Sequence, residues 1–383
     1  MADQTTYADS GVNNELKEEV SEILYNAAKQ TWDNRKGRLG ELIVPFDDFS
    51  GVRAIDVSNL PSGTLMNMGF DGVGTKIELA ERAGDFRTIA YDLFAMVCDD
   101  AVVRGAEPVL IGSILDTNSL KGPDGKPFLE QVKQLAEGYV GAAKEANVAV
   151  VNGETAELGR RVGGYGTFNS NWAAAITWFA RKDRLITGRE IKPGDALVGL
   201  EERGFRSNGI SLVRKIFEKS FGPEWHNQKP AGFGYKTLAE AALVHSRIYS
   251  AAVVDMFGGY CGEPKTEIHG VAHITGGGLP RKLGRVLKPS GLGALIDSPF
   301  MPSDLIHFVQ KLGNVSDEEA YKTWNMGQGM VIITPKPYEV IEIAKAHKIS
   351  AGFIGKVSET PGIIIKSRGY EAFNEIKPRD LMF

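Results

Sequence analysis

The sequence is poor in cysteine: only Cys98 and Cys261 occur in a chain of 383 residues. Neither belongs to a C-x-x-C pair, which excludes a disulfide framework and a thiolate zinc site. So few thiols suit a reducing compartment, and we expect a cytoplasmic protein. Histidine is also scarce, with six in the chain. His269 and His273 are four residues apart, but Gly270 and the later glycines argue against a helix that presents both to zinc.

Long hydrophobic runs and an excess of positive charge are also absent. No stretch of 18 apolar residues occurs, and the first residues, MADQTTYADSGVNNELKEEV, have neither a basic start nor an apolar centre. We therefore expect no membrane span and no export signal. The formal net charge is -4, with acidic and basic residues interspersed. No nucleic-acid partner is expected from such a balance.

Apolar patterning predicts helices and strands that alternate through the whole chain. Helices are predicted at residues 13–32, 87–105, 128–147, 210–221 and 338–348, and strands at 63–70, 107–116, 148–153, 171–180, 196–200, 330–335, 351–357 and 362–367. Charged and turn-forming residues gather between Lys182 and Asp195, which indicates a domain junction. We predict an α+β protein of two mixed α/β domains, residues 1–186 and 187–383.

The stretch GFDGVGTK, Gly69 to Lys76, is close to the phosphate-binding loop G-x-x-x-x-G-K-[ST]. Thr75 and Lys76 stand in reversed order, however, and a shift of one residue turns a side chain by about 100° at a helix start. Asp71 lies inside the loop, where it would repel bare phosphate unless a metal ion lay between them. The loop therefore predicts a site for metal-bound phosphate that is not a P-loop.

Further carboxylates lie near predicted strand ends. Asp92 and Asp99 are seven residues apart in one predicted helix, so they share a face. They form either a solvated face with a salt bridge or, together with Asp71, a Mg²⁺ site with oxygen ligands. Glu154 follows the strand VAVV, where it either caps a turn or meets a ligand. Taken together, the acidic residues favour a metal-bound triphosphate.

Two loops of the second half precede predicted helices. In HITGGG, Thr275, Gly276 and Gly277 lead into a helix, and free backbone N–H groups there can hold phosphate. In RSNG, Ser207 or Asn208 can cap the next helix, and the cap can be their whole role. Arg206, by contrast, can pair with a phosphate.

Seven motifs occur in the order found in one known family: YADSGV, DGVGTK, YDLFAMVCDDAVVRGAEP, NGETAEL, RSNGISLVRK, AHITGGG and NMGQGM. From Tyr7 to about Lys356 the chain thus resembles the phosphoribosylformylglycinamidine cyclo-ligase family, also called aminoimidazole ribonucleotide synthetase. The resemblance implies an amino-terminal sheet that pairs across a homodimer, and ATP bound in a cleft that belongs to neither a P-loop nor a Rossmann fold. It also implies ATP-dependent closure of the imidazole ring of a small ribonucleotide.

The resemblance assigns roles to particular residues. Those implied to bind Mg-ATP are Asp71, Gly72, Gly74, Thr75, Lys76, Asp92 and Glu154, of which Asp71, Asp92 and Glu154 would hold the metal. Those implied to face the substrate and its 5′-phosphate are Arg206, Ser207, Asn208, Thr275, Gly276 and Gly277. The implied catalytic residues are Lys76, Asp92 and His273, whose imidazole can transfer a proton or stabilise an oxyanion near neutral pH. A histidine that is simply packed at a strand end is the alternative for His273.

The chain also departs from the family pattern. Arg206 stands where the family commonly has histidine, Asp99 stands where it usually has asparagine, and GRLGELIVPF replaces a glycine-rich loop. These changes leave two alternatives open. One is a catalytically silent nucleotide-binding dimer, and the other is a different ATP-dependent relative such as a thiamine monophosphate kinase-like enzyme.

Overall fold

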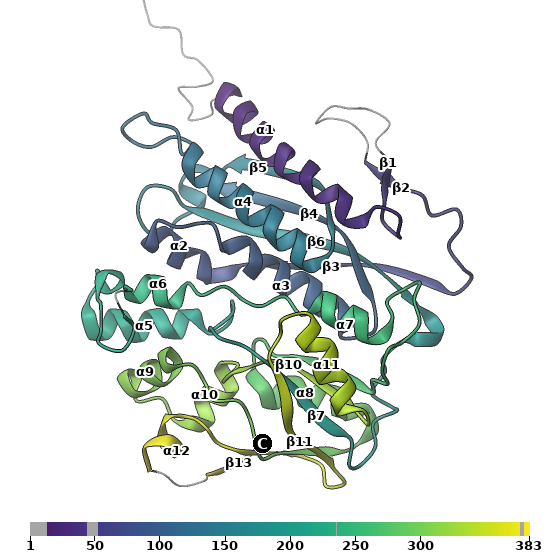
Figure 1. Cartoon of the computed structure of the whole chain (residues 1–383). Coiled ribbons are helices and arrows are strands. Elements are labelled where there is room, and N and C mark those ends of the chain that lie inside the picture. The colour runs from purple at the N-terminus through teal and green to yellow at the C-terminus, as the bar shows by residue number, and fades with distance from the viewer. Residues whose placement is uncertain (1–13, 44–52, 235, 376–378) are drawn as a thin grey trace, which may run out of the picture.

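The amino-terminal half is built on a four-stranded sheet (Figure 1). The computed structural model describes residues 14–43, 53–234, 236–375 and 379–383. The strand order is β3-β6-β4-β5, formed by β3 (Thr64–Gly72), β6 (Ser170–Arg181), β4 (Glu107–Thr117) and β5 (Ala149–Glu157). β6 is antiparallel to β3 and β4, while β4 and β5 are parallel. The four strands predicted in this half are confirmed.

Helices cover one face of this sheet. α3 (Ile89–Val102) and α4 (Leu129–Ala146) pack against each other, and α1 (Asn14–Thr31) lies on α4 beside β5. Nearly every residue of α3 is buried, because its apolar residues surround the helix and meet the sheet, α4 and the second half of the chain. The short α2 (Ile77–Ala83) follows the 3₁₀ helix η3 (Gly74–Lys76). The predicted helices are confirmed, with slightly shorter ends.

The opposite face of the sheet carries exposed apolar side chains. Met66, Met68 and Phe70 of β3 and Ile114 of β4 are exposed, Phe70 by 74% and Met66 by 59%. Among the described residues β3 has a strand partner, β6, on one side only. An exposed apolar edge strand is a surface that proteins normally cover.

The second half is built on a seven-stranded sheet. Its order is β13-β12-β9-β11-β7-β10-β8, and its neighbours are antiparallel except β12 and β9. The strands are β7 (Ala196–Glu201), β8 (Gly270–His273), β9 (Gly293–Ile296), β10 (Gln328–Thr334), β11 (Ala351–Ser358), β12 (Ile363–Lys366) and β13 (Asp380–Met382). The helices are α5 (Ile210–Phe221), α8 (Gly278–Leu287), α9 (Asp304–Gly313), α10 (Asp317–Thr323), α11 (Pro337–Ala346) and α12 (Tyr370–Glu375).

Two helices of the second half pack against the first. α6 (Leu238–Ala242) lies on α2, and α7 (Ser250–Phe257) lies on α3. The ends of β3, α3, β8, α5 and α8 consequently meet in the middle of the molecule. A small third sheet pairs β1 (Leu42–Ile43) with β2 (Ala54–Ile55).

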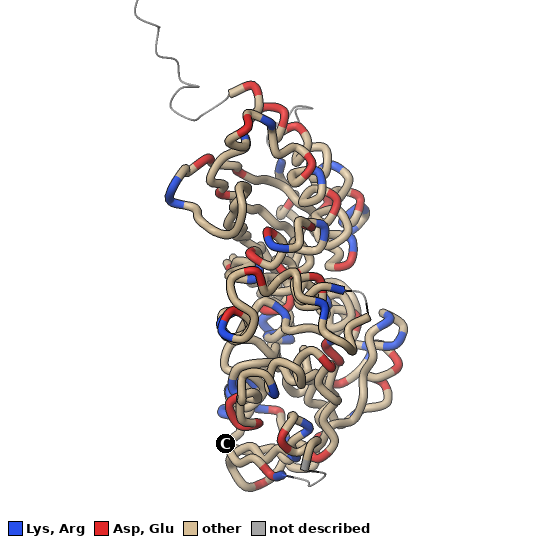
Figure 2. Tube along the Cα trace, turned by 90° about the vertical axis from the view of Figure 1, so that its left-hand side faces the viewer, with Lys and Arg blue, Asp and Glu red and all other residues tan. Residues whose placement is uncertain are grey.

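Charge is spread along the chain as the composition predicts. Figure 2 shows basic and acidic residues interspersed from one end of the trace to the other. Within the described ranges, no helix combines the length and the apolar character that crossing a membrane requires.

Candidate active site

Three of the loops singled out in the sequence converge where the two halves meet. Thr75 in the first loop lies with its Oγ1 3.2 Å from Oγ of Ser211, in the first turn of α5. The loop before α5 lies against the loop before α8, because a Cβ placed on Gly276 would be 3.6 Å from Nδ2 of Asn208. GVGTK, RSNG and HITGGG thus form one region.

The two helices that start in this region begin directly after glycines in the left-handed conformation. Gly209 precedes α5 with φ +77°, and Gly277 precedes α8 with φ +95°, a conformation that favours glycine. A Cβ on Gly278 would also overlap the carbonyl oxygen of Tyr321. In α8, however, the Gly278 N–H is donated to the Thr275 carbonyl at 2.9 Å, and Pro280 has no N–H. The first N–H groups of α5 and one of α8 are therefore available to an anion, with the helix dipoles in support.

Ser207 and Asn208 are placed beside these helix starts. Neither the Ser207 hydroxyl nor the Asn208 amide caps α5 within the described residues. Ser207 Oγ and Asn208 Oδ1 are instead buried and have no hydrogen-bond partner in that part of the chain. Unsatisfied buried polar atoms are rare and costly, so these two atoms point to a polar ligand rather than to a capping role.

Carboxylates approach the same region from β3 and α3. Asp100 Oδ1 of α3 lies 2.6 Å from Nδ1 of His273, at the end of β8. Burial raises the pKa of Asp71, and the nearby Asp100 raises it further. Burial alone would raise the pKa of Asp100, but the hydrogen bond to His273 and the positive charges of Lys282 and Arg206 outweigh burial and lower this pKa. Burial lowers the pKa of Lys282 on α8, against the pull of Asp100 and Asp71.

Arg206 lies behind this cluster and is buried. Its Nη2 is 3.0 Å from Asp99 Oδ2 and 2.8 Å from His273 Nε2, and its Nη1 is 2.8 Å from Glu202 Oε2. Desolvation lowers the pKa of Arg206, but the carboxylates of Glu202 and Asp99 outweigh it and raise the pKa. The two residues that depart from the family pattern, Arg206 and Asp99, therefore contact each other.

Lys76 and Asp92 occupy a different position from the one predicted. Lys76 Nζ lies 2.7 Å from Asp92 Oδ1 and donates to the carbonyl of Val244 at 2.7 Å. Asp92 Oδ1 also accepts from the backbone N–H of Ser246, at 3.0 Å. Both charged side chains are fully buried. Asp92 is thus neither on a solvated helix face nor beside Asp71; it forms a buried ion pair.

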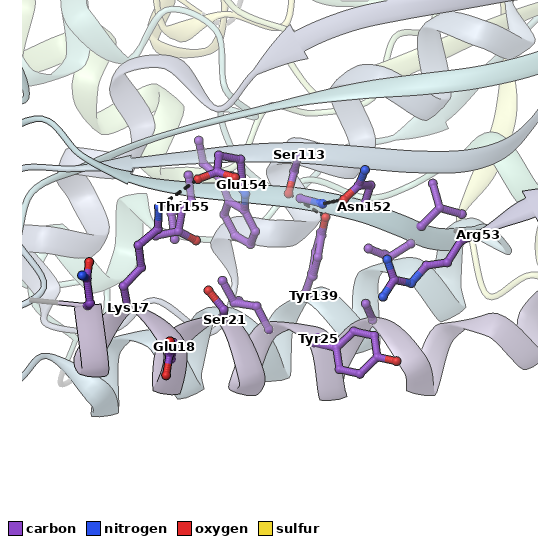
Figure 3. A pocket seen from close by; sticks show the side chains of 18 residues that line it. Lys17, Glu18, Ser21, Tyr25, Arg53, Ser113, Tyr139, Asn152, Glu154 and Thr155 are labelled. Carbon is purple, nitrogen blue, oxygen red and sulfur yellow. Dashed lines mark hydrogen bonds and ion pairs between the residues drawn. The ribbon is translucent and has the colours of Figure 1, made fainter. Parts of the chain in front are cut away.

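Glu154 lies at yet another place. It is in the middle of β5, not at a turn, and its side chain lies 3.2 Å from Lys17 Nζ of α1. Figure 3 shows this pair at a cavity of about 560 Å³ beneath α1, which Tyr139 and Arg53 also line. Among the described residues, no three His, Cys, Asp or Glu side chains group so that they could hold a metal ion. The structure therefore does not bring Asp71, Asp92 and Glu154 together.

Sequence reasoning missed Asp100 and Lys282. Asp100 directly follows Asp99 in one helix, and adjacent helix residues point about 100° apart. The two carboxylates therefore have different surroundings, and this was the signal that Asp100 should be considered separately. The signal for Lys282 was a basic residue four positions after Gly278, one turn into α8. Thr275, Gly72 and Gly74 lie within the loops already described.

Both halves match known family models. Residues 53–170 match the N-terminal domain of AIR synthase related proteins, and residues 192–367 match the C-terminal domain. The fold and the site thus define a two-domain protein of the AIR synthase type.

Curated relatives show which family of AIR synthase related proteins the chain belongs to. A phosphoribosylformylglycinamidine cyclo-ligase of Pyrococcus furiosus is 33% identical over 365 residues, covering 95% of this chain and 98% of the relative. One from Picosynechococcus is 33% identical over 364 residues, covering 94% and 98%. The chain belongs to the phosphoribosylformylglycinamidine cyclo-ligase family.

Solved structures share the fold at low identity. The hydrogenase maturation protein HypE of E. coli matches with a TM-score of 0.59 and 13% identity, covering 96% of both chains. A thiamine-monophosphate kinase from Stenotrophomonas maltophilia matches with a TM-score of 0.56 and 12% identity, covering 89% of this chain and 95% of that one. A HypE solved in complex with ATP has a TM-score of 0.52 and 14% identity, covering 82% and 84%.

Proposed function

We propose that the chain uses ATP to close the imidazole ring of formylglycinamidine ribonucleotide, giving aminoimidazole ribonucleotide, ADP and phosphate in purine biosynthesis. The family supports the reaction, since its curated members carry the cyclo-ligase name. One structural observation carries the proposal for this chain. At one place in the structure the starts of α5 and α8 and the unsatisfied Ser207 and Asn208 meet the Asp71 and Asp100 carboxylates.

The substrate has a phosphate at one end and a formyl amide and an amidine at the other. The backbone N–H groups at the starts of α5 and α8 bind the 5′-phosphate, as at other helix N-termini. Ser207 Oγ and Asn208 Oδ1 hydrogen-bond polar groups of the substrate, which satisfies the two buried atoms. Fixing the amidine nitrogen close to the formyl carbon supplies most of what ring closure needs from the protein.

Asp71 and Asp100 fit a Mg²⁺ ion that arrives with ATP. Magnesium in proteins is commonly held by one or two carboxylates, with phosphate oxygens and water completing its shell. Two carboxylates near each other, one with a pKa raised by burial and by its neighbour, provide such a site. Mg-ATP supplies a phosphoryl group that turns the formyl oxygen into a good leaving group. The structure offers no comparable role to Lys76 and Asp92, whose charges neutralise each other in the interior.

The cavity beneath α1 is the alternative position for the nucleotide. Lys17 and Arg53 line it with positive charge, Tyr139 and Trp172 line it with rings, and Glu154 stands at its edge. The indole Nε1 of Trp172 is buried there without a partner among the described residues. Glu154 is retained as a candidate nucleotide contact for this reason.

The chain forms a homodimer through the apolar face of the amino-terminal sheet. Met66, Met68, Phe70 and Ile114 are exposed on that face, and β3 lies at its edge. Pairing with a second copy would bury these side chains, and each Å² of apolar surface removed from water stabilises the dimer by about 25 cal/mol. A domain junction at residues 186 and 187 and a cytoplasmic location are retained as predictions.

A product assay tests the function. Purified protein with ATP, Mg²⁺ and formylglycinamidine ribonucleotide should release ADP and aminoimidazole ribonucleotide in equal amounts. ADP without the second product would mean that the phosphoryl group goes to water and not into ring closure, whereas ADP released only after thiamine monophosphate is added would favour a thiamine monophosphate kinase-like enzyme. The absence of both products would favour a catalytically silent nucleotide-binding dimer. Either result would overturn the cyclo-ligase proposal.

A further inference from the structure

Both ring nitrogens of His273 have partners. Nδ1 lies 2.6 Å from Asp100 Oδ1, and Nε2 lies 2.8 Å from Arg206 Nη2. The residue is only 3% exposed, so neither nitrogen faces open solvent. Which nitrogen carries the proton is decided by what the two partners can accept.

Arg206 can only donate. A guanidinium has five N–H groups and no acceptor, and it stays protonated in proteins. Its four terminal N–H groups have four acceptors. Nη1 donates to Glu202 Oε2 at 2.8 Å and to the Arg247 carbonyl at 3.0 Å. Nη2 donates to Asp99 Oδ2 at 3.0 Å and to His273 Nε2 at 2.8 Å. The Nε2 atom of His273 must therefore accept a hydrogen bond with its lone pair.

The proton of the neutral imidazole then lies on Nδ1, from which it is donated to Asp100. We propose that Arg206 is a positioning residue, which holds His273 as the Nδ1–H tautomer so that His273 fixes the Asp100 carboxylate beside Asp71. His273 thus works as a hydrogen-bond donor and not as the proton-transferring group of the reaction. The kinetic part of this inference rests on the proposed cyclo-ligase function, while the tautomer does not.

Asp99 is what allows a buried guanidinium at this position. It lies 3.0 Å from Arg206 Nη2, and it accepts from the backbone N–H groups of Tyr249 and Ser250 at 2.9 and 2.8 Å. Two carboxylates, Asp99 and Glu202, thus flank one guanidinium. Removing one partner of a buried ion pair leaves an uncompensated charge, so Arg206 and Asp99 act as one unit.

The tautomer can be measured in the unmodified protein. The chain is labelled with ¹⁵N-histidine, and the signals of its six histidines are compared with those of His273→Asn to identify residue 273. We expect a pyrrole-like Nδ1 and a pyridine-like Nε2 for His273. A pyrrole-like Nε2, or two protonated nitrogens, would overturn the proposal whether or not the protein is active.

The role of Arg206 is tested by Arg206→Gln, since glutamine can accept as well as donate and no longer keeps a proton off Nε2 of His273. We expect the Nε2 signal of His273 to move toward the pyrrole-like range. The matched control is Arg203→Gln, because Arg203 is exposed three residues earlier on the same loop. An unchanged tautomer in folded Arg206→Gln would remove Arg206 as its cause. If this variant does not fold, the measurement on the unmodified protein still decides the tautomer.

Kinetics separate positioning from proton transfer. The amide nitrogen of asparagine can occupy the place of Nδ1 and donate to Asp100, whereas leucine cannot. We expect His273→Asn to keep kcat within about tenfold of the unmodified protein. His273→Leu should lose about a hundredfold, the upper range for a residue that orients a metal-binding carboxylate. Equal losses in both variants would contradict a positioning role. An inactive unmodified protein would instead count against the proposed function.

Discussion

Lys76 Nζ lies 2.7 Å from Asp92 Oδ1, and both side chains are completely buried. The pair connects the GVGTK loop to α3, and Val244 and Ser246 complete it from the second half of the chain. Breaking one side of such a pair leaves a charge in the interior, which costs about 3–5 kcal/mol. The pair thus fixes how the second half packs against the first.

Lys76→Met should therefore lower the free energy of unfolding by about 3–5 kcal/mol, because Asp92 is left without its cation. Urea unfolding monitored by tryptophan fluorescence measures the loss. Lys322→Met is the matched control, since Lys322 pairs with Glu318 on an exposed helix face and should cost less than about 1 kcal/mol. If Lys76→Met is as stable as the control and only raises the KM for ATP, Lys76 binds phosphate after all.

Asp71→Asn should weaken the use of Mg-ATP and leave the fold intact. Its carboxylate is partly desolvated beside Asp100, so the amide costs little in stability but removes a charge that the metal needs. We expect the apparent affinity for Mg²⁺ to fall at least about tenfold, measured as activity against Mg²⁺ concentration.

Glu154→Gln is the matched comparison for the metal site. A Mg²⁺ effect in Glu154→Gln with none in Asp71→Asn would move the nucleotide to the cavity beneath α1. Unchanged kinetics in Asp71→Asn alone would remove Asp71 from the site.

Phe70→Glu should disrupt the proposed dimer. Phe70 is 74% exposed on the edge strand of the amino-terminal sheet, and a charge there would have to be desolvated at the interface. Light scattering coupled to size exclusion should show the mass of two chains for the unmodified protein and of one for the variant. Tyr338→Glu is the control, because Tyr338 on α11 is exposed but distant from that sheet. A monomeric unmodified protein would contradict the dimer.

Glu81 should make stability depend on pH. Burial raises its pKa to about 7, although the N–H groups of Tyr165 and Ser170 act in the opposite direction. The folded protein then binds more protons than the unfolded chain between the ordinary pKa of glutamate and about 7. The contribution of Glu81 to stability is thus present at low pH and is lost as the pH rises through that window.

The urea midpoint, followed from pH 5 to pH 8, measures this loss. Glu81→Gln cannot titrate and should show a smaller decline across the same range. Parallel curves for the two proteins would mean that the Glu81 carboxyl is ionised in the fold like an exposed one.

The sequence predicted elements well where the pattern is local. α5 was predicted at residues 210–221 and is found at Ile210–Phe221, and β4 was predicted at 107–116 and is found at Glu107–Thr117. Their apolar periodicity is strong, and glycines or charged residues mark their ends. The three loops that converge were also singled out in the sequence, because glycines just before a predicted helix are a local signal.

The partners of the charged residues could not be predicted in this way. Arg206 and Asp99 are 107 positions apart, and Asp92 meets a backbone N–H 154 positions away. Only the packing of the second half on α3 decides that Asp92 is an interior ion pair while Asp100 faces the loops. Spacing within one helix placed Asp92 and Asp99 on one face but could not say which partners from the second half each carboxylate would meet.

Adjacent residues on β3 point to opposite sides of the sheet. Phe70 faces the proposed partner chain, and Asp71 faces the proposed metal. A partner that immobilises the strand at Phe70 also restricts the backbone of Asp71, so association and ligand binding share one segment. If dimer formation changes the affinity for Mg-ATP by some factor, Mg-ATP must change the affinity of one chain for the other by the same factor, because linked binding equilibria are reciprocal.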